Sequence, residues 1–481
     1  MTVHRNYVAG EWQAAAATRV NENPSDLDSP VGVYAQGSAA DVSAAVEAAR
    51  AALPAWASAS ASVRASVLQA AADELSARRE ELGELLSREE GKTRAEGIGE
   101  VARAADIFRF YASEAYRAVG ELLPSARQGV SIEVRRQPVG VVGVITPWNF
   151  PIAIPAWKIA PALAYGNAVV FKPAELVPGS AWELAAILDR AGVPAGVFNL
   201  VMGRGSEVGE AIITHLDVNA VSFTGSLGVG RRVAAAGAAR LARVQLELGG
   251  KNPVVVLDDA DLDLAAEHVV NGAFVSTGQR CTASSRIIVT AGVHDRFVER
   301  LAQRTRALRV GHALNPTSDI GPVVDATQLR QNLDYLDLGT REGATQLVAG
   351  ELVERSTRGH YLTPALFVES TAAMRLNREE IFGPIAAVIR VADYDEALAT
   401  ANDSEFGLAA AIMTRSLKHA EHFKRHAQAG MTMVNLATAG QEFQAPFGGV
   451  KNSSYGAREQ GTYAKEFFTT PVTSYVKALN G

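Results

Sequence analysis

The sequence predicts an α/β protein with two parallel sheets, each covered by helices. Three observations support this prediction. The chain has 481 residues, which is too long for one ordinary hydrophobic core, so we expect at least two domains. Helical stretches fill residues 37–119, and short apolar runs that end in Gly or Pro begin at about residue 139. A second alternation of apolar runs with helical stretches begins near residue 253.

The first part of the chain predicts several helices and then a parallel sheet. Residues 37–119 are rich in Ala, Leu, Glu and Arg, and Asp41 is a suitable cap for the first helix. Helical stretches also separate the strands that follow, and one of them begins at Ser180 and ends at Gly192. The buried strands are predicted from the runs VGVVGVITPW, NAVVFKPA, GVFNLVMG, NAVSFTGS and RVQLELGG.

The region from residue 253 to beyond residue 430 predicts a second α/β domain. The run NPVVVLDD indicates a strand, LDLAAEHVVNGAF a helix and SRIIVT another strand. Two further segments, 129–138 and 471–479, predict strands that lie outside both sheets. Such strands either pair with another subunit or form an edge hairpin, and the sequence leaves both alternatives open.

Composition excludes several classes of partner. The net charge is -6, so the chain has no basic excess with which to neutralise nucleic-acid phosphates. The N-terminus lacks the charged start and apolar run of a signal peptide. The longest apolar stretches, such as 139–145, are far shorter than the roughly 20 residues that cross a bilayer. We therefore expect a cytoplasmic protein without nucleic-acid or membrane partners and without a metal ion.

Cys281 is the only cysteine in the chain. A cysteine in a globular protein is most often a small buried apolar side chain. Here its neighbours are small and polar, because it lies within the segment STGQRCTASSR. The adjacent Arg280 can favour the thiolate, which is the nucleophilic form of the side chain. We therefore expect Cys281 to act as a nucleophile.

Two other residues have the chemistry that a nucleophile needs nearby. Glu247 lies between two leucines at a predicted strand end. It is either a surface glutamate beside a turn or a buried carboxylate whose raised pKa suits a general base. Asn149 lies in TPWNFP, which two prolines stiffen. It is either a turn residue or an amide donor to a developing oxyanion.

Two segments are suited to a dinucleotide. FTGSLGVG follows a predicted strand and enters a helix, so backbone N–H groups near Gly225 could bind a phosphate. Its glycine spacing differs from G-x-G-x-x-G and is weak as a pattern on its own. FKPAE follows another predicted strand and supplies a cation, Lys172, and a carboxylate, Glu175.

Seven motifs, in order along the chain, resemble those of the aldehyde dehydrogenase superfamily: TPWNFP, FKPAE, FTGSLGVG, LELGGK, GQRCT, EEIFGP and PFGG. The resemblance covers essentially the whole chain. Three segments look closest to 2-oxoglutarate semialdehyde (2,5-dioxovalerate) dehydrogenases: GQRCTASSR, FKRHAQAGMTMVNLATAG and PFGGVKNSSYGAREQG. The resemblance implies NAD(P)-dependent oxidation of an aldehyde to a carboxylic acid, with 2-oxoglutarate semialdehyde as the expected substrate.

The resemblance also implies roles for four catalytic residues. Cys281 would attack the aldehyde to give a thiohemiacetal, and Asn149 with the backbone N–H of Cys281 would hold the oxyanion. Hydride transfer would leave a thioester, and Glu247 would activate the water that hydrolyses it. Lys158 matches a lysine near these groups and is expected to support them.

The cofactor implied by the resemblance is NAD, with NADP as the alternative. Glu175 would accept the ribose hydroxyls of NAD and repel the 2′-phosphate of NADP, although Lys172 could partly neutralise that phosphate. The residues expected to bind the cofactor are Thr146, Pro147, Trp148, Lys172, Glu175, Gly205, Phe223, Gly225, Ser226, Val229, Gly230, Leu248, Glu380 and Phe382.

The expected substrate pocket combines aromatic side chains with one cation. Arg280 either binds the carboxylate tail of a semialdehyde or tunes the thiolate and its loop. The aromatic residues cover a short aliphatic chain, or they line a pocket for a benzaldehyde- or vanillin-like substrate instead. The expected substrate residues are Phe150, Trp157, Arg280, Phe443 and Phe447.

The family fold implies a division of the chain into three parts. A Rossmann-like NAD(P)-binding domain would take residues 1–119 and 139–250, an α/β catalytic domain 251–450, and a small β oligomerisation element with the tail 120–138 and 451–481. Homodimers or homotetramers are expected. Two rival functions are an acylating enzyme, which typically lacks a base equivalent to Glu247, and an inactive scaffold protein, which the presence of Cys281, Glu247 and Asn149 disfavours.

Overall fold

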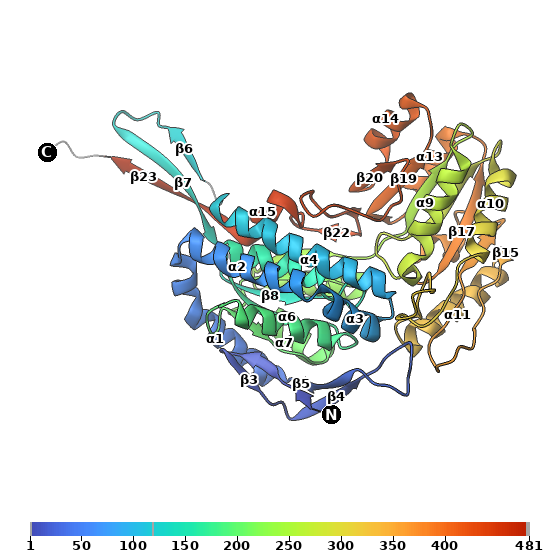
Figure 1. Cartoon of the computed structure of the whole chain (residues 1–481). Coiled ribbons are helices and arrows are strands. Elements are labelled where there is room, and N and C mark those ends of the chain that lie inside the picture. Colours follow the sequence, from blue (N-terminus) through green and yellow to red (C-terminus); the bar gives the residue numbers. More distant parts are fainter. Residues whose placement is uncertain (1, 118–119, 478–481) are drawn as a thin grey trace.

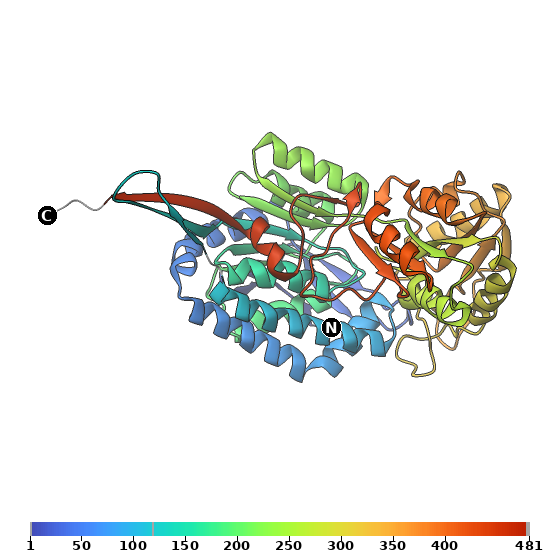
Figure 2. The same cartoon turned by 90° about the horizontal axis from the view of Figure 1, so that it is seen from above.

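The computed structural model describes residues 2–117 and 120–477, and two α/β bodies lie side by side in it (Figure 1). A slender arm of three strands projects from the first body, away from the second (Figure 2). Each body contains one large, mostly parallel sheet with helices packed on it. The α/β class with two parallel sheets that the sequence predicts is therefore confirmed.

The first body is built on an eight-stranded sheet. In spatial order its strands are β22 (Ser454–Tyr455), β12 (Arg243–Glu247), β11 (Ala220–Thr224), β8 (Val141–Ile145), β9 (Ala168–Lys172), β10 (Phe198–Leu200), β2 (Asn6–Val8) and β3 (Glu11–Gln13). The strands from β12 to β10 are parallel to one another. Chain order runs outward from β8 in both directions, so β8 and β11 flank a topological switch point, where a crevice forms at the carboxyl ends of strands.

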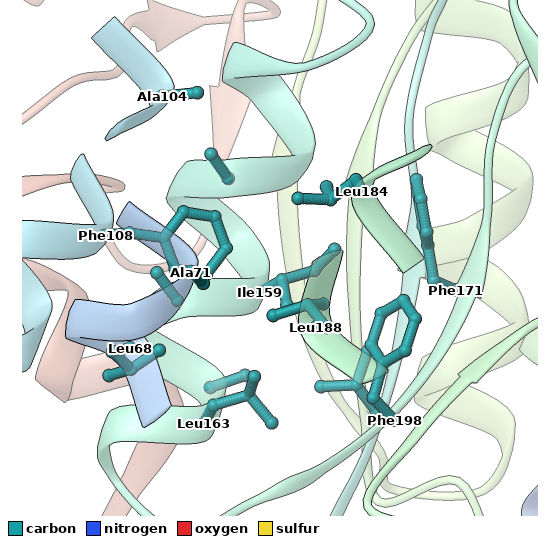
Figure 3. Packing of buried hydrophobic residues seen from close by; sticks show 14 of the residues in the cluster. Leu68, Ala71, Ala104, Phe108, Ile159, Leu163, Phe171, Leu184, Leu188 and Phe198 are labelled. Carbon is teal, nitrogen blue, oxygen red and sulfur yellow. The ribbon is translucent and has the colours of Figure 1, made fainter. Parts of the chain in front are cut away.

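Helices cover both faces of this sheet. They are α1 (Ala39–Ser58), α2 (Ala61–Ala77), α3 (Arg79–Glu90), α4 (Arg94–Glu114), α5 (Ala153–Ala164), α6 (Pro178–Arg190), α7 (Glu210–Thr214) and α8 (Leu227–Ala239). On one face, Leu68 of α2 and Phe108 of α4 join Ile159 of α5 in a cluster that reaches Phe171 of β9 and Phe198 of β10 (Figure 3). Helices α1, α7 and α8 bury their apolar residues on the other face.

The second body has a seven-stranded sheet. In spatial order its strands are β15 (Thr345–Val348), β16 (Ala365–Val368), β17 (Ile385–Val391), β14 (Ser284–Thr290), β13 (Asn252–Val256), β19 (Ala409–Met413) and β20 (Met431–Val434). All neighbours are parallel except β15 and β16. Its helices are α9 (Leu262–Phe274), α10 (His294–Arg306), α11 (Ala326–Arg341), α12 (Arg375–Arg378), α13 (Tyr394–Asn402) and α14 (Leu417–His426).

The arm contains β6 (Glu121–Pro124), β7 (Val130–Pro138) and β23 (Thr469–Lys477). Strand β23 pairs with β7 along its whole length, so the strands predicted at 129–138 and 471–479 do lie outside both large sheets. Residues 478–479 of the predicted strand 471–479 lie outside the described residues. So do residues 1, 118–119 and 478–481 of the predicted domains.

The chain returns from the second body to the first after β20. Strand β22 pairs antiparallel with β12 and places Ser454 opposite Glu247. This return brings residues about 200 positions apart in sequence into one site. The remaining β-strands and α-helix are β1 (Val3–His4), β4 (Ala17–Asn21), β5 (Gly32–Gln36), β18 (Phe406–Gly407), β21 (Val450–Lys451) and α15 (Lys465–Phe468).

The first helix is capped by Ser38, and the prediction that Asp41 is its cap is wrong. The Ser38 side chain accepts from the backbone N–H of Asp41, and the Asp41 carboxylate accepts from the backbone N–H of Ser38 at 2.7 Å. Asp41 therefore holds the third position of a capping box, where its charge still favours the helix N-terminus.

No helix among residues 2–117 and 120–477 is long and apolar enough to cross a membrane.

Candidate active site

Cys281 lines two neighbouring pockets. The first, which we call the inner pocket, has a volume of about 350 Å³ and lies among α4, α5 and the cysteine loop. The second, which we call the crevice pocket, has a volume of about 340 Å³ and lies at the carboxyl ends of β8, β11 and β12. The thiol therefore stands where the contents of the two pockets meet.

The loop before Cys281 has a strained backbone. Ser276, Thr277 and Gly278 all have left-handed conformations, with φ of 53°, 56° and 66°. A β-branched residue such as threonine rarely adopts this conformation, and strain of this kind persists only where the surroundings hold it. At Gly278 a Cβ atom would lie 2.3 Å from the backbone oxygen of Gly383, so only glycine fits there.

Hydrogen bonds from both bodies hold this strained loop. Thr277 Oγ1 donates to the backbone oxygen of Gly321 at 3.1 Å, and Gln279 Oε1 accepts from the backbone N–H of Val324 at 3.0 Å. Ser276 Oγ donates at 2.7 Å to Glu96, which belongs to α4 of the first body. These contacts fix the position of the thiol between the two pockets.

The environment of Cys281 favours the neutral thiol. Burial raises the pKa of Cys281 to about 12, and the negative charges of Glu380 and Glu247 add to this effect. The attraction between Arg280 and the thiolate that the sequence suggests is present, but burial and the two carboxylates outweigh it. A base or a change in the neighbouring charges is needed before the sulfur can attack.

Asn149 and Lys158 take different places around the thiol. Asn149 is buried, lines the crevice pocket and donates from Nδ2 to the backbone oxygen of Gln279 at 3.1 Å. Its amide therefore lies beside the cysteine loop. Lys158 lines neither pocket. It is fully buried and donates to Ser222 at 2.9 Å and to Glu459.

Glu247 is buried, with 2% of its surface exposed, as its apolar neighbours predict. Burial raises the pKa of Glu247 well above its ordinary value, and the charge of Glu459 raises it further, while the Ser454 hydroxyl and Lys158 oppose them. Ser454 Oγ donates to Glu247 Oε2 at 2.7 Å. Glu247 lines neither pocket, but its charge acts on Cys281.

The crevice pocket contains seven of the residues predicted to bind a cofactor. They are Pro147, Trp148, Gly225, Ser226, Leu248, Glu380 and Phe382. Helix α8 begins at this pocket without a side-chain cap at Ser226, and Thr224 Oγ1, in the same lining, is buried without a hydrogen-bond partner. Burial raises the pKa of Glu380 to about 7, although the backbone N–H of Gly250 donates to it at 2.9 Å.

A second polar cluster lies beyond the carboxyl end of β9. Glu175 accepts from the backbone N–H of Gly205 at 3.0 Å and from Arg19 at 2.7 Å. Burial lowers the pKa of Lys172 to about 8, and Glu175 opposes this shift. Sequence analysis missed Arg19, because β4 lies about 150 residues away from Glu175 in the chain.

The other predicted cofactor residues lie near the crevice pocket or near the cluster around Glu175, and none of them lines the crevice pocket. Thr146 directly follows β8 and has a buried, unpartnered hydroxyl. A Cβ atom on Gly225 would lie 2.6 Å from the Phe223 ring, and one on Gly230 would lie 2.4 Å from the Leu248 side chain. Val229 is 49% exposed on α8.

The inner pocket contains four of the five predicted substrate residues: Phe150, Trp157, Arg280 and Phe447. The Trp157 and Phe447 rings pack together with centroids 5.5 Å apart. Phe443 lies outside this lining and packs edge-on against Phe110. The pocket also contains two cations that sequence analysis missed, Lys92 and Arg103.

Comparisons with known proteins point to one family. Residues 12–473 match the model of the aldehyde dehydrogenase family. The alpha-ketoglutaric semialdehyde dehydrogenase of Bacillus subtilis is 46% identical over 477 residues, which cover 98% of each chain. The vanillin dehydrogenase of Corynebacterium glutamicum is 40% identical over 97% of this chain and 96% of its own. The solved structure of betaine aldehyde dehydrogenase from Staphylococcus aureus with NAD+ has a TM-score of 0.96 at 32% identity, covering 98% of this chain and 95% of that chain.

Proposed function

Because this chain belongs to the aldehyde dehydrogenase family, whose model matches residues 12–473, we propose that it oxidises 2-oxoglutarate semialdehyde to 2-oxoglutarate with NAD. The observation that carries this proposal is the position of Cys281, which lines both the inner pocket and the crevice pocket. A nucleophile in this place can hold an aldehyde from one pocket against a cofactor in the other.

The crevice pocket fits a nicotinamide dinucleotide. The uncapped start of α8 offers backbone N–H groups to a pyrophosphate, and the unpartnered hydroxyl of Thr224 offers another donor beside it. Trp148 and Phe382 form one aromatic wall, with ring centroids 5.3 Å apart. Glu380 would accept from ribose hydroxyls. When bound, the nicotinamide accepts the hydride that leaves the substrate carbon.

The first half of the reaction uses Cys281 and Asn149. Cys281 first gives up its proton to solvent water, its sulfur then attacks the aldehyde carbon, and the carbonyl π electrons move to the oxygen, which becomes an oxyanion. The Asn149 amide and the backbone N–H of Cys281 stabilise that charge. Loss of hydride from the same carbon leaves an acyl group on Cys281 as a thioester.

The second half uses Glu247. Its carboxylate takes a proton from water, the hydroxyl adds to the thioester carbon, and the carbon–sulfur bond breaks to release the acid and Cys281. A raised pKa suits this role, because a stronger base takes the proton more readily. Gly448 leaves room for the carboxylate, since a Cβ atom there would lie 2.8 Å from Glu247 Oε1.

The test of the substrate is a panel of aldehydes assayed with NAD. We expect a higher kcat/KM for 2-oxoglutarate semialdehyde than for pentanal, benzaldehyde or vanillin, because the inner pocket combines cations with an apolar wall. The free acid should be the product. Formation of an acyl-CoA would support the acylating rival, and absence of NADH with every aldehyde would support the inactive scaffold.

An aromatic aldehyde is the second candidate substrate. The paired rings of Trp157 and Phe447 line the inner pocket and could stack against a benzene ring. The relative named vanillin dehydrogenase is 40% identical, against 46% for the semialdehyde enzyme. A wild-type preference for benzaldehyde or vanillin would establish this candidate and reject the semialdehyde.

NAD is expected to give a higher kcat/KM than NADP. The carboxylate of Glu175 accepts ribose hydroxyls but repels a 2′-phosphate. Arg19 neutralises that carboxylate only partly, because its side chain is 45% exposed and solvent screens the pair. Glu175→Gln should narrow the preference for NAD about tenfold. Arg19→Gln, the matched change in the residue that pairs with Glu175, should widen the preference for NAD. A higher kcat/KM with NADP, or an unchanged ratio in Glu175→Gln, would contradict this assignment.

The domains and the assembly are proposed from the same resemblance. Residues 1–119 and 139–250 would bind the cofactor, and residues 251–450 would supply the nucleophile. Residues 120–138 and 451–481 would join subunits into a homodimer or homotetramer, although β22 within them pairs with β12. Exposed apolar side chains on the arm, such as Leu122 and Tyr475, support this role.

A further inference from the structure

The inner pocket brings three cations close to Cys281. Lys92 follows α3, Arg103 belongs to α4, and Arg280 precedes the nucleophile. A substrate with a carboxylate tail loses water around its charge when it enters such a pocket, so it needs a cation or N–H donors there. The three side chains differ in how completely their charges are already matched.

The ammonium group of Lys92 already has hydrogen-bond acceptors and a paired carboxylate. Its ammonium donates to Glu100 at 2.8 Å and to the backbone oxygen of Asn149 at 2.7 Å, and it lies 3.9 Å from the centroid of the Phe150 ring. Burial alone would lower the pKa of Lys92, but the carboxylates of Glu100 and Glu90 raise it above its ordinary value. A substrate carboxylate would have to compete with these buried partners.

Arg280 is also paired. Its guanidinium lies 3.4 Å from the Glu96 carboxylate and donates to Ser276 at 3.0 Å. Glu96 in turn accepts from Ser276 and from the backbone N–H of Thr93. Arg280 thus holds the strained cysteine loop against α4. The sequence left two roles open for Arg280, and these contacts favour the loop over the carboxylate tail of a substrate.

Arg103 is different, because its partners are neutral. Its guanidinium donates to the backbone oxygen of Gln441 and, at 3.4 Å, to the side-chain oxygen of Gln460. Its Nε atom is buried and has no acceptor. Within residues 2–117 and 120–477, no carboxylate lies within ion-pair distance of it. The nearest charge that acts on it, Glu100 one turn earlier on α4, forms its ion pair with Lys92. Burial lowers the pKa of Arg103, and the charge of Glu100, which is already paired with Lys92, opposes this shift only in part.

Arg280 Nε is also a buried donor without an acceptor, although the charge of Arg280 is paired with Glu96. Trp157 adds a further unmatched donor to the same pocket. Its indole Nε1 is buried without an acceptor, and its ring lies 5.8 Å from the guanidinium carbon of Arg103. Both residues line the inner pocket. Buried donors without partners are uncommon, and the two side chains that carry these donors line the same pocket, which favours an acceptor that arrives with a ligand. A carboxylate accepts several such N–H groups and matches the planar guanidinium.

We propose that Arg103, with the indole N–H of Trp157, binds the carboxylate tail of the aldehyde substrate, an inference that rests on the proposed semialdehyde substrate. The tail supplies the anion that Arg103 lacks, while the aldehyde end reaches Cys281. Arg103 thereby selects charged aldehydes over uncharged ones of equal length.

The test compares 2-oxoglutarate semialdehyde with pentanal in matched variants. Arg103→Leu should lower kcat/KM for the semialdehyde at least about tenfold, mainly through KM, with a much smaller loss for pentanal. Arg103→Lys should keep part of the preference because it keeps the charge. Arg109→Leu is the control, since Arg109 lies exposed on the same helix and pairs with Asp106 at 2.8 Å; it should resemble wild type on both substrates.

A variant that keeps an aromatic ring at position 157 checks the result independently of the arginine. Trp157→Phe removes the N–H and should raise KM for the semialdehyde several-fold more than for pentanal. Equal losses on both substrates in Arg103→Leu and Trp157→Phe would overturn the inference. If Arg103→Leu does not fold, Arg103→Lys and Trp157→Phe decide the question, and unchanged discrimination in both rejects it. A wild-type enzyme that does not favour the semialdehyde over pentanal would reject the proposed substrate instead.

Discussion

Cys281→Ser is expected to lower aldehyde oxidation at least about 10³-fold while the protein still folds and binds NAD. A serine hydroxyl ionises far less readily than a thiol, and an ester on serine is a poorer acyl donor to water than a thioester. The substitution changes one atom in a pocket lining, so packing should be preserved. Steady-state NADH formation measures the loss, and NAD titration with thermal unfolding confirms the folded state.

The chain offers a matched control for this experiment. Ser285→Ala changes a polar residue of the same segment by one oxygen atom, at a position outside both pockets that contain Cys281. It should retain wild-type turnover. Retention of more than a few per cent of kcat in a folded Cys281→Ser protein would show that another group carries the acyl intermediate.

Glu247→Gln is expected to slow turnover about 10²- to 10⁴-fold and to trap the acyl group on Cys281. The amide cannot take a proton from water, whereas the first half of the reaction does not need Glu247 in our proposal. Rapid mixing should therefore give one burst of NADH per active site and then almost no further turnover. Mass spectrometry of the protein should show an acyl adduct on the only cysteine.

The pH dependence gives this prediction a second measurement. A base acts only when it is ionised, and burial with the charge of Glu459 raises the pKa of Glu247. Deacylation in the wild type should therefore rise with pH through that raised pKa. Ser454→Ala removes a hydrogen bond that lowers the pKa, so the rise should move to higher pH. In Glu247→Gln the rise should be absent, and deacylation at the wild-type rate would identify a different base.

The large elements of this fold were predictable because their signals are local. Buried parallel strands are continuous apolar runs, and each run from VGVVGVITPW to RVQLELGG forms one strand of the first sheet. The motif residues after β8 and β11 meet in space because parallel strands end at the same edge of a sheet. The cap of the first helix was missed because Ser38 and Asp41 both suit a helix N-terminus, and only geometry separates their positions.

The partners of the site residues were less predictable because they come from distant parts of the chain. Ser454 reaches Glu247 only through the return of the chain to β12. Arg103 lies in an alanine-rich helix where arginine is an ordinary surface residue, and no local pattern sets it apart from Arg109. The proposed role of Arg103 depends on the ion pairs that Lys92 and Arg280 form with nearby carboxylates. Those pairs exist only in the folded protein.

The place of Cys281 between two pockets also governs its exposure to oxidants and alkylating reagents. It is the only thiol of the chain, so a sulfenic acid formed on it finds no second cysteine in that chain with which to close a disulfide. Repair then depends on a thiol delivered from outside, and it must enter through one of the two pockets. A ligand in either pocket covers one approach to the sulfur. Reagent uptake per chain therefore counts intact nucleophiles, and the rate of uptake reports how fully the two pockets are occupied.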